Sequence, residues 1–273
     1  MIHPSDIGAR RYAHQAMHTE FEIFCVHDDD DYARQAAWAA FDLLDRLENE
    51  LSRFIPNSDV SRINDLASGE CVRVSRWTME CLELARAAFR ETGGAFDISL
   101  GTGLEKLELA RRDWTVRATA DSVRLDLGGI GKGYAIDRMA EVLDEWDIRQ
   151  ALIHGGHSSV LALDAPAGLD GWPLTMGPRT IAARRQALSA SGIRVQGEHI
   201  VDPRTGRRVS GRMTAWVSMP LDGGASPGAV AEAYSTAFMI LPVEESAAIR
   251  ARHAGMEAWF LESTVAESTP ATT

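Results

Sequence analysis

The chain of 273 residues is long enough to bury a sizeable core, and its 45% hydrophobic and 25% charged residues are typical of globular proteins. The 28 Lys and Arg residues against 39 Asp and Glu residues give a formal net charge of −11, which excludes general binding to nucleic acid or to anionic membrane surfaces. The sequence contains no apolar run of about 18 residues, so we expect no membrane span. The three cysteines lack a C-x-x-C unit and are expected to be reduced thiols.

The first half of the chain is predicted to combine short strands with two long helices. Alternating residues predict a strand over 20–26, and Phe41, Leu44 and Leu51 recur at the spacing of a core helix over 32–54. Ser75 is a suitable cap for a second helix, which the glycines at 93–94 end. The other expected segments are a loose lead-in over 1–13, a short turn at 60–64, an extended piece at 72–74, a polar helical segment near 105–112, and strands near 114–117 and 123–127.

The second half is predicted to be mainly extended, with helices near its end. The expected strands are 150–154, 160–163, 172–176, 180–183, 187–191, 198–201, 213–219 and 257–261, and the expected helices are 229–240 and 243–253. This mixture predicts an α+β fold. No internal repeat or long linker is visible, so residues 1–261 are expected to form a single domain, with 262–273 as a disordered tail.

A glycine-rich stretch over 125–137 places four glycines, two carboxylates and one lysine where an apolar run becomes an amphipathic helix. Glycine lets backbone approach a ligand closely, and a helix start offers free N–H groups and a positive dipole end. The glycine spacing matches neither G-x-G-x-x-G nor G-x-x-x-x-G-K-[ST]. From its residues alone, the stretch is either a phosphate site or a tight connection.

Two further groups of polar residues admit a chemical and a structural interpretation. Glu232, Ser235 and Thr236 share one face of an expected helix, so they either converge on a hard cation or form a polar surface. His199 stands three residues before Asp202 and is either a proton acceptor or a structural histidine.

Taken together, these segments resemble those of the ApbE family of flavin transferases, or FAD:protein FMN transferases. The resemblance runs from about Met17 to Leu261. In the family's order, it rests on Met17-His18-Thr19, Leu51-Ser52-Arg53-Phe54 with Ser58 and Asn64, TGGAFD over 92–97, DLGGIGKGYAID over 126–137, Ser191-Gly192, HIVDPRTG over 199–206, and AYSTA over 233–237.

The resemblance implies mixed or antiparallel sheets flanked by helices, with the flavin site in a central cleft. It also implies an enzyme that binds FAD and Mg²⁺ and transfers FMN to a threonine hydroxyl of an acceptor protein, releasing AMP. His199 is expected to take the threonine proton, and Lys132 to stabilise charge at the pyrophosphate. The expected FAD contacts are Met17, Phe54, Ala95, Phe96, Asp97, Asp126, Lys132 and Val201, and the expected metal ligands are the carbonyl of Gly129 and the side chains of Glu232, Ser235 and Thr236.

The chain departs from the family pattern at three places. Glu232 stands where the family has aspartate, Met17-His18 replaces the usual M-G, and His157-Ser158 stands where an asparagine often occurs. Two alternatives therefore stay open, namely a member that binds or hydrolyses FAD without flavinylating a protein, and a flavin-free scaffold. No signal peptide or lipobox is visible, so we expect a cytoplasmic protein.

Overall fold

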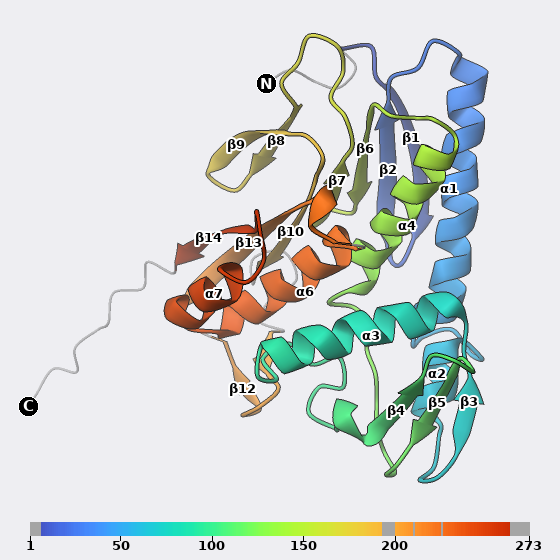
Figure 1. Cartoon of the computed structure of the whole chain (residues 1–273), viewed down its shortest axis with the longest axis vertical. Coiled ribbons are helices and arrows are strands. Elements are labelled where there is room, and N and C mark those ends of the chain that lie inside the picture. Colours follow the sequence, from blue (N-terminus) through green and yellow to red (C-terminus); the bar gives the residue numbers. More distant parts are fainter. Residues whose placement is uncertain (1–6, 193–199, 210, 225, 263–273) are drawn as a thin grey trace, which may run out of the picture.

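A seven-stranded sheet organises the computed structural model, which describes residues 7–192, 200–209, 211–224 and 226–262 (Figure 1). The strand order is β1-β2-β6-β7-β10-β13-β14, and every neighbouring pair is antiparallel. The predicted α+β class with antiparallel strands is therefore confirmed. The strands are β1 (Arg10–Ala16), β2 (Thr19–Cys25), β6 (Ala151–Gly155), β7 (Ser159–Ala162), β10 (Gln186–Gly192), β13 (Arg212–Pro220) and β14 (Glu257–Glu262).

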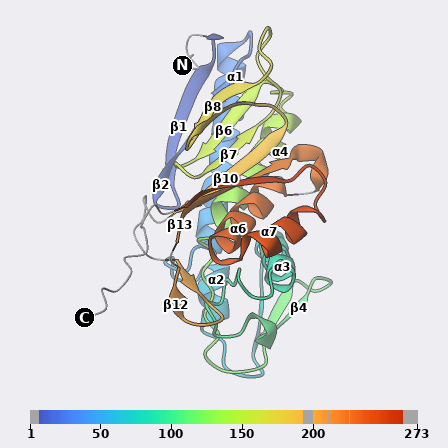
Figure 2. The ribbon, with the colours of Figure 1, turned by 90° about the vertical axis from the view of Figure 1, so that its left-hand side faces the viewer.

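The two faces of this sheet are covered differently (Figure 2). Helices α1 (Asp30–Leu51), α4 (Gly131–Glu145) and α6 (Pro227–Ile240) pack on one face. The hairpin of β8 (Trp172–Met176) and β9 (Arg179–Ala183) packs on the other. Because successive strand residues point to opposite faces, every strand of this sheet except β1 contributes to two separate hydrophobic clusters.

A smaller layer lies beyond the helices. It contains α2 (Asp59–Asn64), α3 (Arg76–Glu91) and a three-stranded sheet of order β3-β5-β4. The remaining elements are β3 (Cys71–Arg73), β4 (Leu107–Ala110), β5 (Thr115–Ala118), β11 (Val201–Asp202), β12 (Arg207–Arg208), α7 (Val243–Arg250) and the 3₁₀ turns η2 (Leu104–Lys106) and η3 (Leu221–Gly223). Among the described residues, no helix is both long and apolar enough to cross a membrane.

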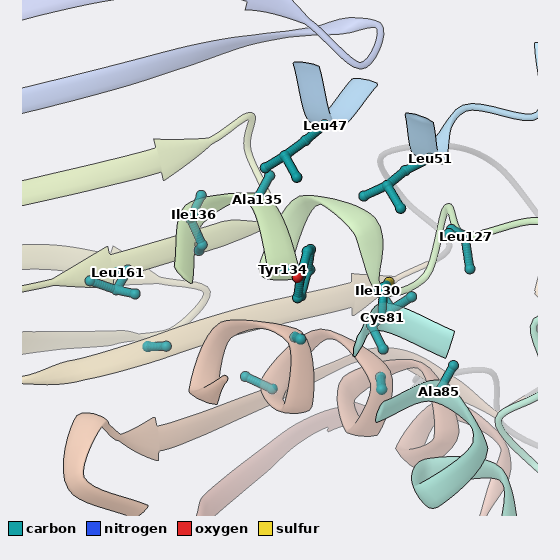
Figure 3. Close-up of a cluster of buried hydrophobic side chains, with 14 of the residues drawn as sticks. Leu47, Leu51, Cys81, Ala85, Leu127, Ile130, Tyr134, Ala135, Ile136 and Leu161 are labelled. Atoms are coloured by element: carbon teal, nitrogen blue, oxygen red, sulfur yellow. The ribbon is translucent and has the colours of Figure 1, made fainter. Parts of the chain in front are cut away.

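The main core joins helices from both layers. Figure 3 shows Leu47 and Leu51 of α1, Cys81 and Ala85 of α3, and Tyr134 of α4 in one cluster. The first turn of α4 is therefore held by apolar contacts from two other helices. All three cysteines are free, as expected.

Several predicted segments are wrong, among them the turn at 60–64, which is helix α2, and the strand at 198–201, of which only Val201 lies in a strand while 198–199 fall outside the described residues. The lead-in over 1–13 contains most of β1, an edge strand whose exposed Arg10 and Arg11 hid its strand character. The helical segment near 105–112 is η2 followed by β4, because pairing with β5 outweighs local helix preference. Residues 123–127 form no strand, although the Asp126 N–H donates to the Ile98 carbonyl at 2.8 Å. The last strand includes Glu262, which was assigned to the tail.

Candidate functional site

A cavity of about 650 Å³ lies at one end of the large sheet, where the sheet meets the loops that follow α1 and α3. Its wall is built from loops and element ends far apart in the sequence. These are the β1–β2 turn at 17–19, the end of α1 with residues 52–54, the turn at 95–100, the glycine-rich stretch at 126–132, the β6–β7 turn at 156–158, the end of β10, residues 200–203, and α6.

The cavity brings together all eight residues that the sequence predicts to contact FAD. Met17, Phe54, Ala95, Phe96, Asp97, Asp126, Lys132 and Val201 all line it. Three of the four predicted metal ligands, Gly129, Glu232 and Thr236, line the same cavity. The predicted proton acceptor, His199, lies outside the described residues, but the next residue in the chain, Ile200, is in the cavity wall.

Asp126 is positioned at the start of the glycine-rich stretch by two donors. The N–H of Gly128 donates to its Oδ1 at 2.9 Å, and Nε of Arg53 donates to its Oδ2 at 2.9 Å. The guanidinium carbon of Arg53 also lies 4.2 Å from the centre of the Phe54 ring, and the His18 ring meets that ring edge-on at 5.6 Å. Arg53 therefore links the predicted carboxylate contact to the predicted aromatic contact.

Lys132 on α4 and Glu232 on α6 form an ion pair at the back of the cavity. The two side chains are 18% and 5% exposed, so the pair is shielded from solvent. The second carboxylate oxygen of Glu232 accepts the N–H of Gly133 at 2.7 Å. A buried carboxylate requires such partners, and here all of them come from the start of α4.

The register between α4 and α6 depends on Gly133 and Asp137. A Cβ on Gly133 would come 2.2 Å from the Gly228 carbonyl oxygen, so only glycine permits this approach. The two carboxylate oxygens of Asp137 accept the N–H groups of Gly228 and Ala229 at 2.8 and 2.9 Å, which caps the start of α6. Burial raises the pKa of Asp137 to about 7, although these two N–H groups act in the opposite direction.

The hydroxyl groups near Glu232 form a compact group of oxygen atoms. Ser235 and Thr236 both donate to the Glu232 carbonyl, at 2.9 and 3.2 Å. Ser191 Oγ at the end of β10 lies 2.9 Å from Ser235 Oγ and 3.0 Å from Thr236 Oγ1. Ser235 is fully buried and does not line the cavity. Thr236 does line it and faces Gly129, since a Cβ added to Gly129 would lie 3.6 Å from Thr236 Oγ1.

The chemistry of these donors fits a hard cation. Within the described part of the chain, no group of three or more His, Cys, Asp or Glu residues is arranged to hold a metal. Mg²⁺, however, commonly binds one or two carboxylates together with substrate phosphates rather than an all-protein cage. Glu232 would supply the carboxylate, and Thr236 and the carbonyl of Gly129, which line the same wall, would supply neutral oxygens.

The charge of the cavity wall also favours a cation. Among the described residues that line the cavity, there are four carboxylates and two basic side chains. The formal charge of the wall is therefore −2 when the histidines are neutral. The carboxylates are Glu48, Asp97, Asp126 and Glu232, and the cations are Arg53 and Lys132. A ligand that carries a pyrophosphate would add further negative charge, so a divalent cation would lower the cost of binding it.

Several residues shape the site although the sequence predicted no role for them. Arg53 lies within a quoted motif, but only the fold shows that it reaches Asp126. His18 and His157 line the cavity from neighbouring turns, since β2 and β6 pair side by side. Ser191 was quoted without a role, and its contact with the α6 hydroxyls could have been found only from strand order.

Comparison with known proteins gives a consistent result. The model of the ApbE family matches residues 17–105 and 100–260. An FAD:protein FMN transferase of Klebsiella pneumoniae (strain 342) is 27% identical over 207 residues, covering 65% of this chain and 62% of that protein. One from Vibrio cholerae serotype O1 is 23% identical over 222 residues, covering 63% of this chain and 65% of that protein. The matched stretches thus span less than two thirds of these relatives.

Solved structures share the fold over nearly the whole chain. The flavin transferase ApbE from Vibrio cholerae superposes with a TM-score of 0.80 at 20% identity, covering 94% of both chains. The apo form of the Pseudomonas stutzeri flavinyl transferase ApbE also gives 0.80 at 20% identity, covering 93% of both chains. The ApbE protein from Thermotoga maritima gives 0.78 at 21% identity, covering 93% of this chain and 94% of that one. With a family model that matches most of its length, the chain belongs to the ApbE family.

Proposed function

We propose that the protein transfers the FMN half of FAD to a threonine hydroxyl of an acceptor protein in a Mg²⁺-dependent reaction that releases AMP. The observation that carries this proposal is the gathering of all eight predicted FAD contacts around the buried Lys132–Glu232 pair in one cavity. The relatives named FAD:protein FMN transferase support the same activity.

The proposed reaction exchanges one phosphorus–oxygen bond for another. The threonine oxygen bonds to the phosphorus of the FMN half, the bond from that phosphorus to the bridging oxygen breaks, and AMP leaves with that oxygen. The hydroxyl proton passes to a base, for which His199 is the candidate, because an imidazole with a pKa near ~6.5 accepts protons at neutral pH. The two pyrophosphate charges of FAD become one on the phosphodiester and two on AMP, with one proton released.

The residues of the cavity have separate roles in this proposal. Lys132 holds a positive charge beside the pyrophosphate, and the charge is kept in place by Glu232. Asp126 accepts hydrogen bonds from the nucleotide, and Phe54 offers it an apolar face. Mg²⁺, held by Glu232, Thr236 and the Gly129 carbonyl, would supply Lewis-acid stabilisation of negative charge on the phosphate oxygens.

The transfer is tested by incubating the purified protein with FAD, Mg²⁺ and threonine-containing acceptor candidates. We expect AMP to appear together with an acceptor that has gained the mass of FMN. AMP and free FMN without a modified acceptor would instead establish an FAD hydrolase. FAD that is bound but unchanged would establish a flavin-binding protein, and either result would contradict the transfer.

A further inference from the structure

Leu100 is an exposed leucine at the rim of the cavity. It is 69% exposed and it contributes to the cavity wall. Its φ angle of 51° lies in the left-handed region, which is strained for a residue other than glycine. Exposure of the apolar Leu100 side chain to water and strain in its backbone both disfavour this conformation. Strained residues of this kind concentrate at functional sites.

The strained turn is held in place by Asp97. Oδ1 of Asp97 accepts the N–H and the hydroxyl of Ser99 at 2.8 and 2.7 Å, and Oδ2 accepts the N–H of Gly101 at 2.8 Å. The N–H of Leu100 donates to the Asp97 carbonyl at 3.1 Å. These bonds fix the backbone on both sides of Leu100, so its side chain is presented to solvent in a defined position.

A second cavity of about 220 Å³ adjoins the first at this turn. Asp97 and Pro203 line both cavities, and four glycines form much of the wall of the smaller one, namely Gly93, Gly94, Gly101 and Gly103. Glu105 and Arg204 also line this cavity, so its wall offers charged side chains as well as backbone. Of the eight predicted FAD contacts, Asp97 alone lines this smaller cavity, so we expect FAD to leave the smaller cavity free.

The turn packs directly against the segment that follows the candidate base. A Cβ on Gly101 would lie 3.0 Å from the Pro203 carbonyl oxygen. Val201, 41% exposed, lines the main cavity from the same segment. Leu100, Val201 and Pro203 therefore form one continuous stretch of the rim of the main cavity.

We propose that this rim and the glycine-lined cavity bind the acceptor protein. An apolar acceptor side chain near the modified threonine packs on Leu100, and the acceptor chain continues from there into the smaller cavity. The inference rests on the proposed function, because an acceptor is required only if FMN is transferred to a protein. Continuity between the two cavities at Asp97 and Pro203 favours the acceptor as the occupant.

The test uses the full chain, FAD, Mg²⁺ and a library of synthetic peptides with one central threonine and varied neighbours, read by mass spectrometry. Leu100→Gly should unfold at an equal or higher temperature because glycine releases the strain. It should bind FAD within about twofold of the wild type, yet label peptides at least about tenfold more slowly and lose the preference for an apolar neighbour. Leu100→Met should keep that preference.

Ser122→Gly is the matched control, since Ser122 is exposed, has a φ of 65°, and lines neither of these cavities. It should label peptides as the wild type does. If Leu100→Gly labels peptides with unchanged rate and preference, the docking surface is wrong while the transfer stands. If the wild type converts FAD to FMN and AMP and labels no peptide, the transfer itself is wrong and the docking inference falls with it.

Discussion

Lys132 and Glu232 lie 100 residues apart in the chain and meet as a shielded ion pair between α4 and α6. The pair joins the glycine-rich stretch to the helix that carries the predicted metal ligands. Each charge depends on the other for its burial, because removing one partner leaves the other charge without compensation. The geometry of the site and the stability of the fold are therefore coupled at this pair.

Substitution of Glu232 separates the role of its charge from the role of its length. Glu232→Ala leaves Lys132 without its partner and should lower the free energy of unfolding by about 3 kcal/mol, measured by urea titration. Glu232→Asp restores the residue usual in the family and should keep or raise the Mg²⁺-dependent release of AMP. Glu244→Ala, at an exposed position on α7, is the control. An inactive Glu232→Asp variant that folds and binds FAD normally would remove Glu232 from the set of metal ligands.

Asp137 should make stability depend on pH in a predictable direction. Burial raises its pKa to about 7 in the fold, against about 3.9 in the unfolded chain, so the folded state binds the proton more tightly. This contribution is fully present below about pH 4 and is lost as the pH rises through about 7. The wild type should therefore lose stability relative to Asp137→Asn across that window, measured by urea unfolding at several pH values. The exposed Asp113→Asn should show no such trend, and a flat difference for Asp137→Asn would refute the prediction.

Arg53→Ala should weaken FAD binding with little effect on the fold. Its pair with Asp126 is partly exposed and contributes only about 0.5 kcal/mol to stability. Without Arg53, however, the described cavity wall becomes more negative, so the Kd for FAD should rise about tenfold, or about 1.4 kcal/mol. Arg184→Ala removes an exposed arginine paired with Asp164 away from the cavity and is the control. Equal FAD affinity in both variants would show that Arg53 does not act on the ligand.

His199→Ala should slow transfer far more than it weakens FAD binding. Loss of a general base typically reduces a rate by about 100-fold or more, whereas the Kd for FAD should change by less than about threefold. Single-turnover transfer and fluorescence titration of FAD measure the two quantities separately. Parallel loss of both would indicate that His199 only shapes the cavity.

Sequence patterns predicted the elements that show helical spacing of apolar residues or a short apolar run. The helical spacing of Phe41, Leu44 and Leu51 located α1, and the strands at the centre of the sheet were predicted by short apolar runs. Strand β1 was missed because it is an edge strand with exposed arginines, and β4 was missed because its partner strand decides its conformation. Local patterns do not contain this information.

The residues of the candidate site were predicted by resemblance, but their contacts depend on long-range packing. Helical spacing places Glu232, Ser235 and Thr236 on one face without showing that Ser235 is fully buried and contacts Ser191 instead of lining the cavity. Likewise, nothing local indicates that Arg53 reaches Asp126. Such pairs require the strand order and the register of α4 on α6.

A crystal structure of the protein with FAD and Mg²⁺ tests the central claim most directly. The account predicts the pyrophosphate beside Lys132, the metal between the Gly129 carbonyl, Glu232 and Thr236, and the nucleotide in contact with Asp126 and Phe54. FAD bound outside this cavity, or a metal that does not contact Glu232, would contradict it.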